Sequence, residues 1–189
     1  AEAGIDLEEA TAPLIEQIIQ FQPHVVTTYD EHGGYPHPDH IRTHEVTMAA
    51  VAQAAPLWQV SKVYYHQPFH KQKVLALHEA ALAHGYESPY AQWIEDILRR
   101  PDDSHRITTR VPCADYFTVR DEALKAHATQ IDPSGHWFAL PAEVAREVWP
   151  TEDFELPSAA LPNAGPGAAL LPGCGKGKPR TQTPVGGSR

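Results

Sequence analysis

Apolar residues recur along this chain at helical spacing in some segments and in short runs in others. Over residues 7–19, leucine, isoleucine and alanine return every three or four positions, which predicts a helix with one apolar face. Short runs of β-branched and aromatic residues predict strands over residues 24–29, 60–65 and 107–111. Helical periodicity predicts further helices over residues 41–53, 72–84, 90–99, 121–130 and 141–150. Strands that alternate with helices indicate an α/β fold, with a doubly wound, mostly parallel sheet between flanking helices.

The acidic residues are confined to the first part of the chain. All 24 Asp and Glu precede Pro157, together with 11 of the 15 Lys and Arg, so this part carries a net charge of −13. A nucleic-acid-binding domain needs a basic face, so we expect no nucleic-acid partner. The chain has no apolar run near 18 residues and no signal-peptide pattern. We therefore expect no membrane contact and a cytoplasmic location.

Residues 157–189 differ in composition from the rest. They are rich in Pro, Gly, Ala, Ser and Thr, with no aromatic residue, and we expect a disordered tail. The glycine and lysine run at 173–178 lacks the spacing of a phosphate-binding loop. Of the two cysteines, Cys113 is expected to be a small buried residue and Cys174 lies in the tail, so neither a disulfide nor a cysteine zinc site is expected.

The candidate chemistry lies in the loop that follows the first predicted strand, Tyr-Asp-Glu-His-Gly-Gly-Tyr-Pro-His-Pro-Asp-His at 29–40. Its glycines and prolines exclude regular structure, and the carboxyl end of a strand is where open α/β sheets place ligands. Histidine supplies neutral nitrogen ligands and transferable protons, and aspartate orients histidine or binds metal. The alternative is a histidine-rich surface turn in a chain with 12 histidines.

A catalytic zinc uses three protein ligands and one open position for water, whose pKa it lowers to roughly 7. We predict His40 as a zinc ligand, because packing at the start of a helix can hold its ring. His37, between two prolines, is predicted to donate to the oxyanion of an attacked amide or to protonate the leaving amine. Asp39 would orient one of these imidazoles, and Tyr35 would add a second oxyanion donor or bind substrate.

The loop resembles the second signature of the LmbE-like zinc deacetylase and amidase superfamily, and within it the match is closest to mycothiol S-conjugate amidases. Further segments of similar sequence follow in the family's order, at 88–90, 106–115, 127–133 and 149–154. The resemblance covers roughly residues 7–156 and implies a Rossmann-like sheet.

The resemblance implies the same roles: His40 as the zinc ligand, His37 as the oxyanion-side histidine, Asp39 as the supporting carboxylate and, less firmly, Tyr35 as the active-site tyrosine. His32 is expected to be an ordinary loop residue, and Asp30 and Glu31 to shape the loop or bind substrate hydroxyls. Packing or loop support is expected of His127 and Gln130. The remaining histidines that we considered are expected to be ordinary surface or interface residues: His66, His70, His78, His84, His105 and His136.

The family's first signature, His-Pro-Asp-Asp, has no counterpart in this sequence. The nearest string, residues 100–103, lacks the histidine and is expected to form a turn after a helix. We therefore expect residues 1–156 to be the C-terminal part of an LmbE-like domain, with a sheet that is incomplete on its N-terminal side and a first strand without a neighbour.

The function implied is a zinc-dependent hydrolase that cleaves the amide bond of mycothiol S-conjugates in thiol-dependent detoxification, with a small-molecule thiol conjugate as substrate. Two alternatives remain open. One is the N-acetylglucosaminyl-inositol deacetylase of mycothiol biosynthesis, and the other is an inactive remnant, since two of three ligands and the base are absent from this sequence. The oligomeric state is not predicted.

Overall fold

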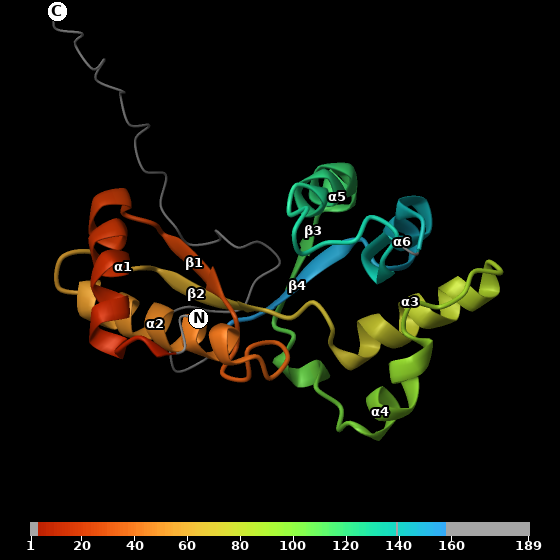
Figure 1. Ribbon diagram of the computed structural model, residues 1–189, viewed down its shortest axis with the longest axis horizontal. Coiled ribbons are helices and arrows are strands. Elements are labelled where there is room, and N and C mark those ends of the chain that lie inside the picture. The colour runs from red at the N-terminus through yellow and green to blue at the C-terminus, as the bar shows by residue number, and fades with distance from the viewer. Residues whose placement is uncertain (1–3, 139, 158–189) are drawn as a thin grey trace, which may run out of the picture.

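The computed structural model describes residues 4–138 and 140–157, apart from the side chain of His136. The cysteine Cys174 and all but the first residue of the predicted tail lie outside these ranges. The regular elements follow in the order α1 (Leu7–Phe21), β1 (Val25–Thr28), α2 (Pro38–Ala54), β2 (Lys62–His66), α3 (Lys71–Ala83), α4 (Ile94–Arg99), β3 (Thr109–Pro112), α5 (Phe117–Lys125), α6 (Ala142–Val148) and β4 (Thr151–Glu155) (Figure 1). The predicted α/β class is confirmed.

The four strands form one sheet in the order β1-β2-β4-β3. The first two strands run parallel, with Val26 opposite Val63, while β4 runs antiparallel to both β2 and β3. The sheet is therefore less parallel than the alternation of helices and strands suggested, because β4 inserts between β2 and β3 in the opposite direction. The first strand also has a neighbour, contrary to expectation: β1 pairs with β2 and lies at one edge of the sheet.

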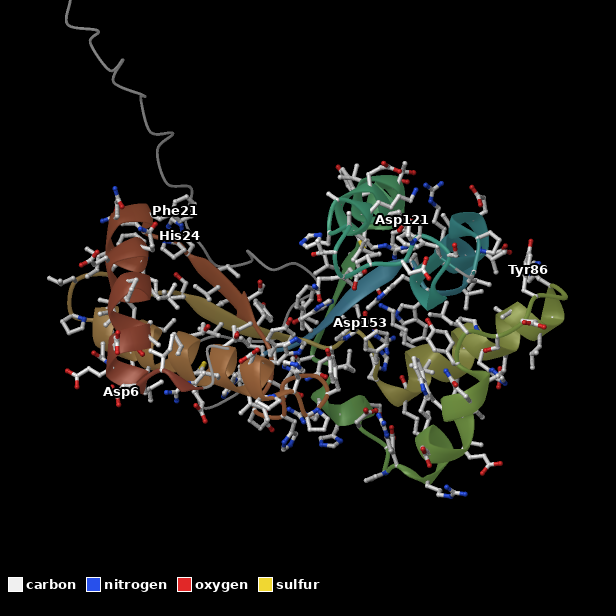
Figure 2. The ribbon with its side chains drawn as sticks, in the orientation of Figure 1. Asp6, Phe21, His24, Tyr86, Asp121 and Asp153 are labelled. Atoms are coloured by element: carbon white, nitrogen blue, oxygen red, sulfur yellow. The ribbon has the colours of Figure 1, made fainter. Side chains whose placement is uncertain are left out.

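The main core lies between α1, α2 and the second strand. Ile18 of α1 and the small residues Ala50 and Ala54 of α2 are buried together with Val63 of β2. Alanine at these positions lets the two helices and the strand approach closely, and burying the larger side chains supplies about 1.5–3 kcal/mol each. Asp6 caps the start of α1 by accepting a hydrogen bond from the amide of Glu8 at 2.9 Å. Figure 2 labels Asp6 and Phe21 at the two ends of this helix.

The other helices gather on the far side of the sheet, where α3 contacts α4 and α6, and α5 contacts α6 (Figure 1). The predicted helices at 72–84 and 141–150 are found, and Gly85, with φ of +76°, follows the end of α3 as the sequence indicated. The helix predicted at 121–130 instead spans Phe117–Lys125. It begins earlier because Phe117 is an anchor with only 2% of its surface exposed.

The strand β4 was not predicted, because its sequence Thr-Glu-Asp-Phe-Glu is mostly polar. Its central residue Asp153 is completely buried and accepts three side-chain hydrogen bonds, from His70, Trp149 and Thr151, each at 2.7 Å. Burial raises the pKa of this carboxyl, but the three donors outweigh it and hold the pKa below its usual value. His70 is therefore a buried partner of β4 and not the ordinary surface or interface residue that was expected.

His70 joins the sheet to α3 because its two ring nitrogens serve different elements. Its Nε2 lies 2.7 Å from Asp153, and its Nδ1 accepts a hydrogen bond from the amide of Lys73, which caps α3. Asp103 also accepts from the amide of Lys71 at the same helix end. Residues 100–103, predicted as a turn, instead form an irregular segment after α4, and Asp103 in it supplies this second cap.

Within the described residues, no helix is both long and apolar enough to cross a membrane.

We expect Asp153→Ala to lower the free energy of unfolding by about 3 kcal/mol, because the buried donors of His70, Trp149 and Thr151 would lose their acceptor. Urea denaturation measures this change. Glu79→Ala, on an exposed position of α3, is the control and should change stability by less than about 0.5 kcal/mol. A loss below about 1 kcal/mol for Asp153→Ala would contradict the role assigned to this network.

Candidate active-site loop and pocket

The loop between β1 and α2 is shaped around Asp30, which has only 5% of its surface exposed. Its Oδ1 accepts hydrogen bonds from the amides of His32, at 3.1 Å, and Gly34, at 2.9 Å. Burial raises the pKa of this carboxyl, but the bonds from Gly34, Gln67 and His32 outweigh it, so the pKa lies below its usual value. Of the two roles expected for Asp30, the structure thus supports shaping of the loop. His32 itself is exposed, in keeping with an ordinary loop residue.

Two glycines with positive φ turn the chain at the tip of this loop. Gly33 and Gly34 both have φ of +72°, which residues with a side chain adopt only with strain. They differ in the space around them. A Cβ on Gly33 would lie 2.9 Å from Cβ of His40 and 3.0 Å from the amide nitrogen of Ile41, whereas one on Gly34 would meet only the Tyr29 ring at 3.7 Å. Gly33 therefore allows the loop to lie against the first turn of α2.

The close approach places the Gly33 carbonyl 3.0 Å from Nδ1 of His40. A carbonyl oxygen only accepts, so Nδ1 carries the proton and donates, and Nε2 of His40 keeps a lone pair. The ring also stacks on Tyr29, with centroids 4.1 Å apart and planes 8° from parallel. His40 is thus held in one orientation and in a tautomer that leaves Nε2 available to a metal.

His37 has the opposite tautomer. It is the N-cap residue of α2, and its Nδ1 accepts a hydrogen bond from the amide of Asp39 at 3.2 Å. Because Nδ1 is the acceptor, the proton of the neutral ring lies on Nε2, which is a donor. The rings of His37 and His40 have centroids 4.9 Å apart. Two adjacent imidazoles therefore offer one lone pair and one N–H group.

The other two predicted site residues lie beside these rings. Tyr35 is 56% exposed, and its ring meets the rings of His40 and His37 edge-on, at 4.9 and 6.0 Å. Asp39 lies in the first turn of α2, where its amide orients His37 and its carbonyl accepts from the hydroxyl of Thr43. The structure thus brings Tyr35, His37, Asp39 and His40 together. It does not bring them together with further ligands: across residues 4–138 and 140–157, no group of three or more His, Cys, Asp or Glu could hold a metal ion.

His44 is a residue of this site that the sequence reasoning missed. Its Nδ1 lies 2.9 Å from the carbonyl oxygen of Tyr29, so the two histidines of α2 bond the start of the loop, at Tyr29, and its tip, at Gly33. The ring of His44 also meets that of Tyr65 edge-on at 5.1 Å. A spacing of four residues on a predicted helix places His40 and His44 on one face, and this signal was available in the sequence.

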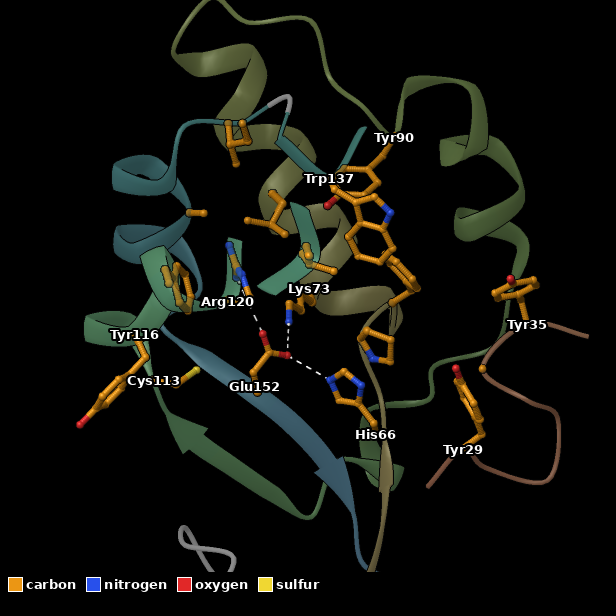
Figure 3. A pocket seen from close by; sticks show the side chains of 18 of the residues that line it. Tyr29, Tyr35, His66, Lys73, Tyr90, Cys113, Tyr116, Arg120, Trp137 and Glu152 are labelled. Atoms are coloured by element: carbon orange, nitrogen blue, oxygen red, sulfur yellow. Dashed lines mark hydrogen bonds and ion pairs between the residues drawn. The ribbon is translucent and has the colours of Figure 1, made fainter. Parts of the chain in front are cut away.

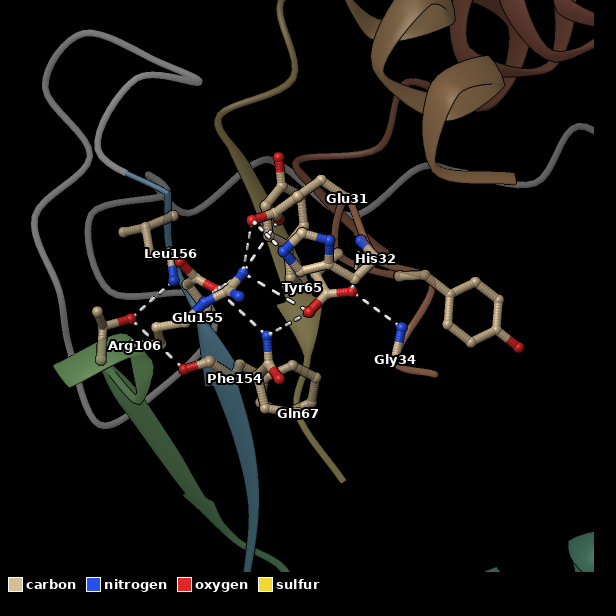
Figure 4. A network of polar contacts seen from close by, with 12 residues as sticks. Glu31, His32, Gly34, Tyr65, Gln67, Arg106, Phe154, Glu155 and Leu156 are labelled. Carbon is tan, nitrogen blue, oxygen red and sulfur yellow. Dashed lines mark hydrogen bonds and ion pairs between the residues drawn. The ribbon is translucent and has the colours of Figure 1, made fainter. Parts of the chain in front are cut away.

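Arg106 ties the loop to the end of β4 (Figure 4). Its guanidinium lies 2.7 Å from a carboxylate oxygen of Glu155 and 3.0 Å from one of Glu31, and 3.6 Å from Asp30. Gln67 reinforces the same junction by donating to both Asp30 and Glu155. Burial lowers the pKa of Arg106, but the three carboxylates outweigh it and raise the pKa above its usual value. Glu31 therefore also shapes the loop.

A pocket of about 540 Å³ opens beside the loop and extends toward α3, α5 and α6 (Figure 3). Tyr29, Tyr35 and His40 line one end of it. Mostly aromatic and aliphatic side chains from helices and loops line the rest, together with a few charged ones. Cys113 is half-buried in this wall, and burial followed by the charge of Glu152 raises the pKa of its thiol. A protonated thiol is a weak nucleophile, which agrees with its expected role as a small apolar residue.

One group of charges lies in the pocket wall. Glu152 accepts from His66 at 3.1 Å and lies 3.5 Å from Nζ of Lys73 and 3.8 Å from the guanidinium of Arg120 (Figure 3). Burial raises the pKa of Glu152, but the hydrogen bond from His66 and the charges of Lys73 and Arg120 outweigh it and lower the pKa to about 2. His66 lines the pocket and is therefore not an ordinary surface residue. By contrast, His127 and Gln130 are exposed, and His127 bonds the carbonyl of Ala123 within its own helix end.

We expect Gly33→Ala and Gly34→Ala to separate backbone strain from displacement of His40. Both substitutions should lower the free energy of unfolding by roughly 1–2 kcal/mol, because alanine is strained at a positive φ. Only Gly33→Ala should also move His40 away from the carbonyl of residue 33, because its new Cβ meets Cβ of His40 at 2.9 Å. The ¹⁵N chemical shifts of the His40 ring report the tautomer. Equal ring spectra in the two variants would contradict the role given to Gly33.

We expect the stabilising effect of Glu152 to depend on pH. Its folded-state pKa of about 2 lies below the ordinary value of 4.5, so the ionised form stabilises the fold above pH 4.5. This contribution, at most about 3 kcal/mol, is lost as the pH falls from 4.5 toward 2. Unfolding free energies of wild type and Glu152→Gln should therefore converge over that window. Glu95→Gln, in an exposed ion pair, should differ from wild type by less than about 0.5 kcal/mol throughout. A gap between wild type and Glu152→Gln that is constant with pH would contradict this assignment.

Comparison with known proteins includes the loop in the matched segment. Residues 2–51, which include the loop and most of α2, match the PIG-L family, described as GlcNAc-PI de-N-acetylase. The chain is similar to the mycothiol S-conjugate amidase of Streptomyces coelicolor, with 46% identity over 89% of this chain and 61% of that protein.

Two further relatives are 1D-myo-inositol 2-acetamido-2-deoxy-alpha-D-glucopyranoside deacetylases. Those of Nocardiopsis dassonvillei and Thermobifida fusca are each 38% identical, over 81% and 85% of this chain and 56% and 58% of their own lengths. The chain thus spans about three-fifths of the length of these relatives. The predicted resemblance is confirmed: residues 2–51 match the PIG-L family, and the chain is similar over most of its length to a mycothiol S-conjugate amidase and to these deacetylases.

Proposed function

We propose that this chain supplies one part of the active site of a zinc-dependent amidase that hydrolyses the amide bond of mycothiol S-conjugates. The observation that carries the proposal is the pair of opposite tautomers, with a lone pair on Nε2 of His40 and a proton on Nε2 of His37. Amide hydrolysis at a metal needs both a nitrogen ligand and a nearby donor. The similarity to the Streptomyces coelicolor amidase supports the choice of reaction.

His40 is the proposed zinc ligand. The Gly33 carbonyl accepts from Nδ1, as the outer-sphere acceptor of a metal-binding histidine usually does, and stacking on Tyr29 holds the plane of the ring. A catalytic zinc takes three protein ligands, and the described residues do not assemble three. The described residues therefore fit zinc in part, with His40 as one ligand. When bound, zinc would supply an activated water near neutral pH.

His37 is the proposed donor to the oxyanion that develops on the attacked carbonyl, or to the leaving amine. Its Nε2–H is the group that performs either task, since Nδ1 is occupied by the amide of Asp39. Asp39 acts through its backbone as well as through the carboxylate that the resemblance implies. Tyr35, half-exposed and in edge contact with both imidazoles, would bring its hydroxyl to the substrate as a second donor.

Deacetylation of N-acetylglucosaminyl-inositol is the second candidate function. The 38% identity to two deacetylases favours it, because the same chemistry removes an acetyl group from an amine. The two functions differ in the size of the acyl group that the pocket must hold. This group is small in the deacetylase substrate and large in a thiol conjugate. An inactive remnant remains the third interpretation, and it predicts weak zinc binding even when the chain is joined to the part of a relative that it does not match.

We expect the chain alone to bind zinc weakly and with less than one zinc per chain, because His40 is one ligand of the three that tight binding needs. Joining the chain to the part of the Streptomyces coelicolor amidase that it does not match should restore tight binding and hydrolysis. In this joined protein His40→Ala should remove zinc, whereas His37→Ala should keep zinc and lower kcat by about 10²-fold.

Zinc content and steady-state rates on an amide-linked thiol conjugate are measured on the same preparations. His32→Ala is the matched control, since this exposed histidine of the same loop should change neither quantity. Loss of zinc from His37→Ala as readily as from His40→Ala would contradict the division of roles. A joined protein that binds zinc but cleaves only the acetylated sugar would favour the deacetylase.

A further inference from the structure

The pocket continues well beyond the candidate active-site loop. Past His40 and Tyr35 it becomes a region that we call the aromatic arm, lined mainly by Phe69, Leu77, Tyr90, Phe117, Leu124 and Trp137. Figure 3 shows Tyr29 and Tyr35 at one side, and Tyr90 and Trp137 on the wall between them and Arg120. The arm and the loop belong to one continuous pocket, so a molecule that reaches His40 can extend into the arm.

The aromatic rings of the arm are buried to different extents, and Trp137 leaves part of its surface open. Phe69 and Trp137 lie with centroids 5.2 Å apart, and Trp137 is 39% exposed. Tyr90 stands in the same wall, where burial raises the pKa of its hydroxyl and keeps it neutral. Rings in this arrangement offer apolar faces and edges, which bind other apolar and aromatic groups.

The charges of the arm are already paired with one another. Lys73 and Arg120 both face Glu152, and Arg120 also bonds Asp121 at 2.8 Å and lies over the Phe117 ring at 4.0 Å. The two cations and two carboxylates of this cluster have no net charge, so the cluster would not attract a charged ligand. The arm is therefore suited to an uncharged group with a large apolar surface.

We propose that the aromatic arm binds the substituent carried on sulfur by the thiol conjugate, and that the chain prefers apolar and aromatic substituents. This inference rests on the proposed function, because the amide must lie at His37 and His40 for the sulfur substituent to extend into the arm. A pocket of about 540 Å³ is of the size that holds a drug-sized group. An acetyl group would leave the arm empty, which favours thiol conjugates over the acetylated sugar.

Binding to the full chain tests the proposal without a need for zinc. The probes are N-acetylcysteine methylamides with methyl, butyl, hexyl or benzyl on sulfur, and calorimetry gives their dissociation constants. We expect affinity to rise about threefold for each methylene that enters the arm. Equal affinity for the methyl and hexyl probes would overturn the proposal.

Two variants from different walls of the arm locate the binding. Phe69→Ala should weaken the benzyl probe by about tenfold. Ala145→Phe, which fills the arm from α6, should weaken the hexyl probe by about tenfold and leave the methyl probe unchanged. Phe21→Ala, at an exposed ring in α1, is the matched control and should bind every probe as wild type does. Wild-type affinity of either folded arm variant for the probe that it should weaken would overturn the assignment, so the test stands even if the other variant unfolds.

Failure of this proposal is distinguishable from failure of the proposed function. If affinity rises with the length of the substituent while the joined protein with its zinc cleaves no amide, the arm is supported and the amidase is rejected. If amides are cleaved but neither affinity nor kcat/KM depends on the substituent, the amidase is supported and the arm is overturned.

Discussion

The candidate site depends on the hydrogen bond between the Gly33 carbonyl and Nδ1 of His40. It forms only because Gly33 has no side chain and has a positive φ, so that the loop can lie against the first turn of α2. The bond fixes the tautomer of His40 and brings its ring onto Tyr29. The same first turn of the helix sets the opposite tautomer of His37 through the amide of Asp39. The chemical difference between two neighbouring imidazoles thus follows from backbone geometry.

The sequence predicted the elements that have a clear apolar period. The helices α1, α2 and α3 and the strands β1, β2 and β3 lie within a few residues of their predicted positions. It missed β4, since Glu152, Asp153 and Glu155 make this segment polar. Each of these carboxylates is stabilised by partners far along the chain, such as His70 for Asp153 and Arg106 for Glu155. Periodicity carries no information about such long-range pairing, and the antiparallel place of β4 in the sheet was missed for the same reason.

The part of the site that one loop supplies could be predicted from the sequence, whereas the part that combines distant segments could not. Tyr35, His37, Asp39 and His40 lie within six consecutive positions, so one loop brings them together. Their roles remain a proposal. The pocket beside them combines residues from Tyr29 to Glu152, and only the fold brings these to one place. His44 lies between the two cases, because its spacing from His40 was visible but its bond to the Tyr29 carbonyl needed the loop conformation.

The contacts of Arg106 have a consequence for the motions of the protein. The guanidinium bonds both Glu31 in the loop and Glu155 at the end of β4, and Gln67 spans the same two segments. Opening of the loop must therefore break the contacts of Arg106 with Glu31 and of Gln67 with Asp30, which connect it to a strand paired on both sides in the sheet. The amide protons of His32 and Gly34, bonded to Asp30, should therefore exchange with solvent more slowly than those of a loop without such contacts. The motion of a surface loop is in this way limited by its contacts with the sheet.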